Sequence, residues 1–167
     1  MLSFHLTSMP PSEPCDADLR IEQAGPADLD QAAPLFDAYR QFYKRPPDLD
    51  ACRRYLSARL TRHDSVLYLG FAPATSTRAS GFVHLYPSFD SLAMRSLWIL
   101  YDLYVAPESR RLGLGRALMN RAAALARETG ASCLTLETAR DNLSAQVLYE
   151  QLGYRRDELF LHYSLLL

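Results

Sequence analysis

Residues 108–118 read "ESRRLGLGRAL", and two glycines stand one residue apart where a helical pattern begins. The pattern continues through residues 114–130, with an apolar stripe at helical spacing formed by Leu114, Leu118, Ala122 and Leu125. Gly130 is suited to end this helix. The run before the glycines, "RSLWILYDLYV" at 95–105, is almost wholly apolar, as is typical of a central strand covered on both faces. The stretch therefore predicts a strand, a tight turn and a long helix.

The glycines at the head of this helix point to an anion site. A helix start presents unpaired N–H groups and the positive end of the helix dipole, which together bind phosphate if the ligand can come close. Gly113 and Gly115 carry no side chain that would block the approach, and Arg110, Arg111 and Arg116 add positive charge. The spacing matches neither the dinucleotide fingerprint nor a P-loop. A glycine-rich helix entry solvated by arginines, and a domain that binds NAD or ATP, remain the alternatives.

The bulk composition predicts one soluble globular protein. The 167 residues are 49% hydrophobic and 22% charged, with a net charge of -1, so no overall basic field attracts nucleic acid or a membrane. Three scattered cysteines form no metal or disulfide pattern, which favours reduced thiols, no metal and a cytoplasmic location. Neither a secretory signal nor a bilayer-spanning run is present. We expect a flexible leader over residues 1–18 and a single domain over 19–167.

The remaining periodicities predict an α/β or α+β fold with a mixed central sheet. Pro34 lies inside the first predicted helix and is expected to kink or split it. Besides the two elements around the glycines, strands are predicted at 19–24, 65–72, 79–87, 132–138 and 158–167, and helices at 25–45, 49–63 and 142–153.

Two segments together resemble the GNAT superfamily of acetyl-CoA-dependent N-acetyltransferases, residues 102–118 and residues 138–154. The first resembles the family's pyrophosphate loop and the second its Asn-x-x-Ala-x-x-x-Tyr-x-x-x-Gly block. The matching positions are Arg110, Gly113, Gly115, Asn142, Ala145, Tyr149 and Gly153. Within the family, the sequences of these two segments most resemble the small-amine and histone/polyamine-type branch. The resemblance implies a mainly antiparallel sheet flanked by four helices.

The same resemblance implies how acetyl-CoA is held. Backbone groups of the central strand would pair with the pantetheine arm, the glycine loop would hold the pyrophosphate, and the last helix would contact the arm. The implied residues are Leu103, Tyr104, Val105, Arg110, Arg111, Leu112, Gly113, Leu114, Gly115, Arg116, Asn142 and Tyr149.

The resemblance also implies that Tyr149 is the general acid, since a phenol can protonate a departing thiolate; a core aromatic is the alternative. Asp102 stands beside the predicted acyl site in an apolar run and is a candidate base, with structural pairing to an arginine or a backbone group as the alternative. Glu137 is the second candidate. His84 and His162 fall in strand patterns and receive no role.

The first two helices would wall the acceptor site in such a fold. Aromatic residues there and in residues 84–92, with an acid nearby, suit an amine cation; core packing on an amphipathic helix is the alternative for Tyr39 and Phe42. These candidates are Tyr39, Phe42, Tyr43, Tyr86, Phe89 and Asp90. The predicted function is direct acetyl transfer from acetyl-CoA to a primary amine of a polyamine, amino acid or similar small molecule. Alternatives are a protein lysine or N-terminal acetyltransferase and a non-catalytic acyl-CoA-binding module. The apolar run at 160–167 favours a homodimer.

Overall fold

The elements follow the predicted order, except at the C-terminus. A computed structural model describes residues 18–166, and the chain divides between Leu136 and Glu137 into two compact units. The predicted leader lies almost wholly outside the described residues. The first unit contains β1 (Arg20–Gln23), η2 (Pro26–Asp28), α1 (Leu29–Phe42), α2 (Leu49–Arg62), β2 (Val66–Phe71), β3 (Gly81–Asp90), β4 (Arg95–Val105), η3 (Pro107–Ser109), α3 (Leu114–Glu128) and β5 (Leu134–Leu136); the second contains α4 (Leu143–Gln151).

The sheet is mixed and mainly antiparallel, as predicted. Its strands lie in the order β1-β2-β3-β4-β5, and only the β4–β5 pair is parallel. The connection from β4 through α3 to β5 is therefore the single crossover of the first unit.

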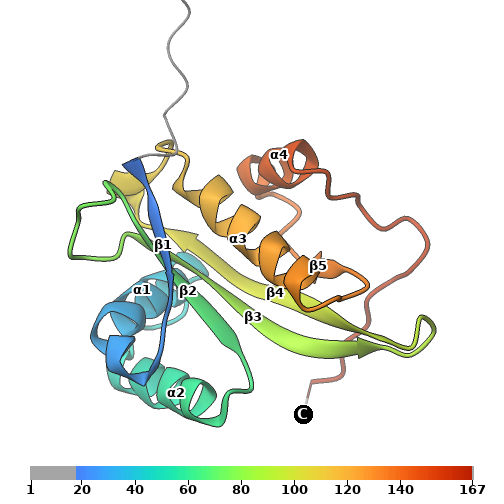
Figure 1. The fold of residues 1–167 in the computed structure, drawn as a ribbon, viewed down its shortest axis with the longest axis horizontal. Coiled ribbons are helices and arrows are strands. Elements are labelled where there is room, and N and C mark those ends of the chain that lie inside the picture. Colours follow the sequence, from blue (N-terminus) through green and yellow to red (C-terminus); the bar gives the residue numbers. More distant parts are fainter. Residues whose placement is uncertain (1–17, 167) are drawn as a thin grey trace, which may run out of the picture. The chain divides into compact units, whose positions relative to one another are not determined.

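The two faces of the sheet are covered by different helices: α1 and α2 lie on one face and α3 on the other (Figure 1). Alternation along β3 explains this division, because successive side chains point to opposite faces. Phe82 packs against Phe36 of α1, with ring centroids 5.9 Å apart. Its neighbour Gly81 faces Leu114 of α3, and a Cβ at Gly81 would lie 2.7 Å from the carbonyl oxygen of Tyr104. Gly81 thus lets β4 and α3 approach closely.

Helix α1 continues through Pro34, so of the predicted kink or split the split does not occur. A proline inside a helix removes one backbone hydrogen bond. Here the loss is offset by burial, because Ala33, Leu35 and Phe36 around it all lie in the core. Helix α2 is capped by Asp48, whose side chain accepts a hydrogen bond from the Ala51 N–H at 2.9 Å.

The second unit begins at Glu137 and holds α4. The Asn142 side chain caps this helix and accepts from the Ala145 N–H at 3.4 Å, as the sequence predicted. The predicted closing strand over 158–167 is wrong, because residues 158–166 form no strand. An alternating apolar run indicates strand propensity but does not supply a neighbouring strand to bond with. Within residues 18–166, no helix is long and apolar enough to cross a lipid bilayer.

Candidate active site

Strand β4 organises the candidate site, because it loses its partner on one side part-way along. Trp98 to Leu100 pair with β5, and the ladder to β5 ends there. Residues 101–105 are then held by β3 alone within the first unit. In an antiparallel pair only about half of a strand's N–H and C=O groups face its partner. The backbone of residues 101–105 therefore offers a row of groups on the β5 side for another extended chain.

The opening coincides with a bulge in β4. His84 pairs with Asp102 and Leu85 pairs with Leu100, so Tyr101 is the extra residue. Tyr101 is 66% exposed and its ring meets the edge of Tyr86, with centroids 5.6 Å apart. A bulge bends its strand and increases the local twist. The bend redirects β4 at the point where its ladder to β5 ends.

The loop after β4 has the shape that the glycines predicted. Gly113 is the N-cap of α3 with a left-handed φ of 86°, and Arg111 also has a positive φ of 63°. Among residues 18–166 no side chain caps this helix start, and its first turn holds no acidic residue. Arg110 folds back, and its Nε donates to the Val105 carbonyl oxygen at 3.0 Å. The result is an uncapped helix N-terminus beside cationic side chains, which suits a phosphate group.

Not every loop residue that was predicted to bind acetyl-CoA can do so with its side chain. The Leu114 side chain is buried against the glycines of β2 and β3, so only its backbone can reach a ligand. Arg111 and Leu112 are exposed. The guanidinium of Arg110 lies 5.9 Å from the ring centroids of both Phe42 and Tyr104.

Asp102 lines a cavity of about 450 Å³ on the face covered by α1 and α2. We call this the α1–α2 cavity. Its lining residues are Phe36, Tyr39, Arg40, Tyr43, Arg45, Ala51, Cys52, Tyr55 and Asp102. Of the residues predicted to surround an acceptor, Tyr39 and Tyr43 are among them; Phe42, Tyr86, Phe89 and Asp90 are not.

His84 holds the Asp102 carboxylate, a role that the sequence did not reveal. Its Nδ1 lies 3.3 Å from Asp102 Oδ2, and its Nε2 lies 2.8 Å from the Ser65 hydroxyl. Because a carboxylate only accepts, the contact with Asp102 favours a proton on Nδ1, and in that neutral tautomer Nε2 accepts from Ser65. His84 is fully buried and Asp102 is 6% exposed. The alternative that Asp102 pairs structurally with an arginine or a backbone group is replaced by a histidine pair.

The order Ser65–His84–Asp102 resembles a nucleophile triad in composition but has the opposite orientation. In a triad the hydroxyl meets the substrate. Here the carboxylate lines the cavity, while Ser65 is buried and does not. The arrangement orients a carboxylate instead of activating a serine.

Two tyrosines extend this network. The Tyr86 hydroxyl lies 3.4 Å from His84 Nδ1 and 2.5 Å from the Tyr55 hydroxyl. Burial is the main reason that the pKa of Tyr86 is raised, with the hydrogen bond to Tyr55 adding to it. Tyr86 therefore remains a neutral hydrogen-bonding group at physiological pH.

The remaining candidates lie in the second unit. Asn142 uses its side-chain oxygen as the α4 cap. Tyr149 is half-buried and its ring packs on Tyr154, with centroids 6.1 Å apart. Glu137 is exposed and lies 3.3 Å from His162 in the same unit. The general-acid role of Tyr149 stays a prediction.

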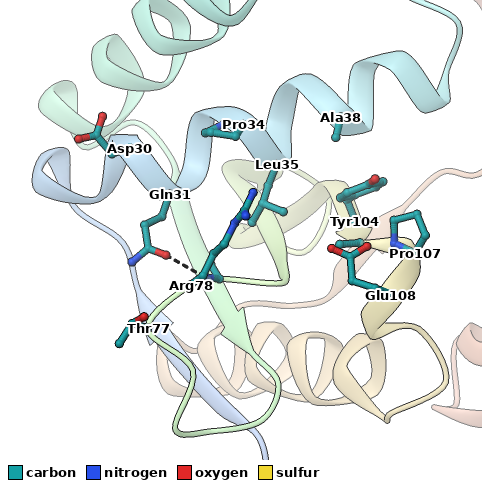
Figure 2. Close-up of a pocket in the computed structure, with 12 residues that line it drawn as sticks. Asp30, Gln31, Pro34, Leu35, Ala38, Thr77, Arg78, Tyr104, Pro107 and Glu108 are labelled. Carbon is teal, nitrogen blue, oxygen red and sulfur yellow. Dashed lines mark hydrogen bonds between the residues drawn. The ribbon is translucent and has the colours of Figure 1, made fainter.

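A second cavity, of about 590 Å³, lies between α1, the β2–β3 connection and the end of β4 (Figure 2). The Ala79 N–H donates to the Gln31 side chain at 2.8 Å and ties the connection to α1. Figure 2 shows Arg78 pointing toward Leu35 of α1. Tyr104, predicted to contact the cofactor, lines this cavity and not the α1–α2 cavity.

A model of the acetyltransferase (GNAT) family matches residues 32–154, most of the chain. The chain belongs to the GNAT family. It is an N-acetyltransferase of a family that depends on acetyl-CoA. The uncharacterized N-acetyltransferase YhfO of Bacillus subtilis (strain 168) is 42% identical over 147 residues, which cover 88% of this chain and 97% of the relative.

Solved structures agree with the GNAT fold. The crystal structure of "a probable acetyltransferase" is 43% identical with a TM-score of 0.84, and the match covers 89% of this chain and 97% of that one. An aminoglycoside acetyltransferase from a soil metagenome, solved in complex with sisomicin, has a TM-score of 0.74 over 91% and 98% of the two chains. At 20% identity, this second likeness shows the fold alone.

The first unit of this GNAT protein fits acetyl-CoA on two observations. The uncapped start of α3 beside Arg110 and Arg111 suits a diphosphate. The backbone edge at residues 101–105 suits an arm that carries amide groups, because both sides can exchange hydrogen bonds as a strand does.

Proposed function

We propose that the protein transfers the acetyl group directly from acetyl-CoA to a primary amine of a small molecule, which binds in the α1–α2 cavity. One observation carries this proposal: β4 holds both the Asp102 carboxylate, which lines the cavity, and the backbone edge suited to the donor. A single strand thus brings a base and a donor site within a few residues of each other. Such positioning is a large part of what an acyl-transfer catalyst supplies.

Asp102 serves as the base in this proposal. The acceptor arrives as an ammonium ion, and Asp102 takes one proton from it, directly or through a water molecule. His84 fixes the direction of the carboxylate, because its Nδ1 lies 3.3 Å from one carboxylate oxygen while its Nε2 lies 2.8 Å from the Ser65 hydroxyl on the other side of the ring. The second carboxylate oxygen is left for the amine.

The remaining roles belong to the backbone and to the second unit. Acetyl-CoA supplies the acetyl group as a thioester. A backbone N–H near Val105 donates to the thioester carbonyl oxygen, and the loop from Arg110 to Arg116 holds the diphosphate. Asn142 contacts the pantetheine arm. Tyr149 gives its proton to the departing thiolate and regains one from the amine nitrogen as the amide forms, while the first proton, held by Asp102, is released to solvent.

We further propose that two copies associate and that the protein acts in the cytoplasm. The C-terminal segment supports association, because Leu159, Phe160 and Leu161 are each more than 70% exposed and Leu165 is 85% exposed. Exposed apolar side chains in a row commonly mark a contact surface. Light scattering on the purified protein tests the dimer; a monomer at all concentrations contradicts it.

Release of CoA across a panel of amines tests the proposed reaction. We expect transfer to at least one small amine, a loss of turnover in Asp102→Asn and Tyr149→Phe, and normal turnover in the controls Asp18→Asn and Tyr163→Phe at exposed positions. Transfer only to peptides would support a protein acetyltransferase instead. CoA binding without any transfer would support a binding module, and unchanged turnover in Tyr149→Phe would show that its assignment as the acid is wrong.

A further inference from the structure

The wall of the α1–α2 cavity carries charges of both signs. Asp102 of β4 contributes the negative charge, and Arg40 and Arg45, from the end of α1 and the segment after it, contribute positive charge. The rest of the lining is aromatic or apolar. A cavity with this composition suits a ligand that carries charges of both signs together with an apolar body.

The two arginines differ in how far their charge is already compensated. Arg40 lies 3.7 Å from Asp37 Oδ1, and its Nη1 donates to the Pro46 carbonyl oxygen at 3.4 Å. Asp37 is itself fixed, because it accepts from the Asp48 N–H at 2.9 Å and from Gln41 at 2.9 Å. The positive charge of Arg40 is thus matched by a carboxylate within the α1–α2 connection.

Arg45 has no such counterpart. Its backbone N–H donates to Arg40, but among residues 18–166 its side chain makes no hydrogen bond or ion pair. Arg45 is exposed and is one of the residues that line the cavity. A planar guanidinium binds a carboxylate through two parallel hydrogen bonds. Arg45 is therefore suited to bind the carboxylate of a ligand.

We infer that the acceptor is a primary amine that also carries a carboxylate, an amino acid in the broad sense, with an apolar body. The inference rests on the proposed function, since it takes the α1–α2 cavity as the acceptor site. The ammonium lies at Asp102 and the carboxylate at Arg45, and the apolar body lies among the aromatic side chains. A polyamine brings a second cation to the arginines, where like charges repel.

The aromatic side chains are placed to hold the body of such a molecule. Phe36 and Tyr55 stack with centroids 5.6 Å apart and an interplanar angle of 5°. Tyr39 and Tyr43 meet edge to face at 5.2 Å. Their rings present apolar faces, and the tyrosine hydroxyls supply polar contacts. Within a cavity of about 450 Å³, this leaves room for an amino acid with a sizeable side chain.

Matched pairs of probes test this inference by equilibrium binding. The pairs are phenylalanine against 2-phenylethylamine and 5-aminopentanoate against 1,5-diaminopentane, each titrated calorimetrically into the protein in the presence of CoA. In at least one pair we expect the carboxylate-bearing member to bind about 10-fold more tightly or better, the range of a charge-assisted hydrogen bond. Arg45→Gln should remove the preference, whereas Arg54→Gln, the same change at an exposed α2 position outside the cavity, should keep it.

The outcomes separate this inference from the proposed function. If no carboxylate-bearing probe binds more tightly than its partner, or if Arg54→Gln abolishes the preference as fully as Arg45→Gln, the inference is wrong. Release of CoA with the plain amines would in that case leave the proposed function intact. Absence of CoA release with every amine would overturn the proposed function, whichever probe binds more tightly.

Discussion

Replacing His84 with glutamine or with asparagine separates its two hydrogen bonds. The glutamine amide reaches about as far as Nε2 and can keep Ser65, whereas the asparagine amide reaches about as far as Nδ1 and can keep Asp102. His84→Gln therefore removes the Nδ1 contact of the buried Asp102 carboxylate, and a hydrogen bond to a charged group contributes about 1.5–3 kcal/mol. His84→Asn loses the neutral bond to Ser65, about 0.5–1.5 kcal/mol.

Both substitutions remove the imidazole ring, which packs on Tyr86 with centroids 4.6 Å apart and on Phe36 at 6.4 Å. That loss is shared, so the difference between the two variants reports how much more the contact with Asp102 contributes than the bond to Ser65. We expect His84→Gln to be the less stable variant by about 1 kcal/mol in the free energy of unfolding.

Urea unfolding followed by fluorescence measures this difference, provided that the slope with denaturant is unchanged. The same two substitutions are then made in the Asp102→Asn variant. Residue 102 carries no charge there, so the stability difference between the two substitutions should shrink. Equal stability of His84→Gln and His84→Asn, or a difference that persists without the Asp102 charge, would show that His84 does not hold the carboxylate.

Three further changes probe the fold and the donor site. Gly81→Ala places a methyl group against the Tyr104 carbonyl oxygen, 2.7 Å away, and should lower the free energy of unfolding by about 1–3 kcal/mol in denaturant titrations. Gly113→Ala forces a side chain into a φ of 86°, which costs about 1–2 kcal/mol, and should weaken calorimetric binding of CoA; tighter or equal binding would contradict the proposed loop. Burial raises the pKa of Tyr86 and of Tyr68 above the ordinary value of 10.0, so their stabilising contribution is complete below about pH 10 and is lost as the pH rises further. Urea midpoints should therefore fall as the pH rises above about 10, and less steeply in Tyr86→Phe.

Local patterns were enough to predict the frame of the site. The apolar run of β4 and the glycines before α3 each act over a few residues, where periodicity and backbone freedom decide the structure. The helix caps followed the same logic, as the Asn142 cap of α4 shows. Pro34 was the exception, because burial on either side of it outweighed a missing hydrogen bond.

Long-range pairing decided what the sequence could not show. His84 was a lone histidine in a strand, and its role depends on a register that places it opposite Asp102. The bulge at Tyr101 sets that register, and no local pattern marks it. The strand predicted at 158–167 is wrong for a related reason, since strand propensity alone supplies no neighbouring strand to pair with. The difference between the two arginines also depends on the fold. Asp37 lies next to Arg40, whereas among residues 18–166 no carboxylate pairs with Arg45.

The most direct measurement compares binding and turnover in Asp102→Asn. Calorimetry should show that this variant binds acetyl-CoA as tightly as the wild type, because the donor is held by the β4 backbone and the α3 loop. With the best amine of the panel, kcat/KM should fall about 100-fold or more, the usual contribution of a positioned base. Undiminished kcat/KM would contradict the role of Asp102, and failure of either protein to bind acetyl-CoA would contradict the donor site itself.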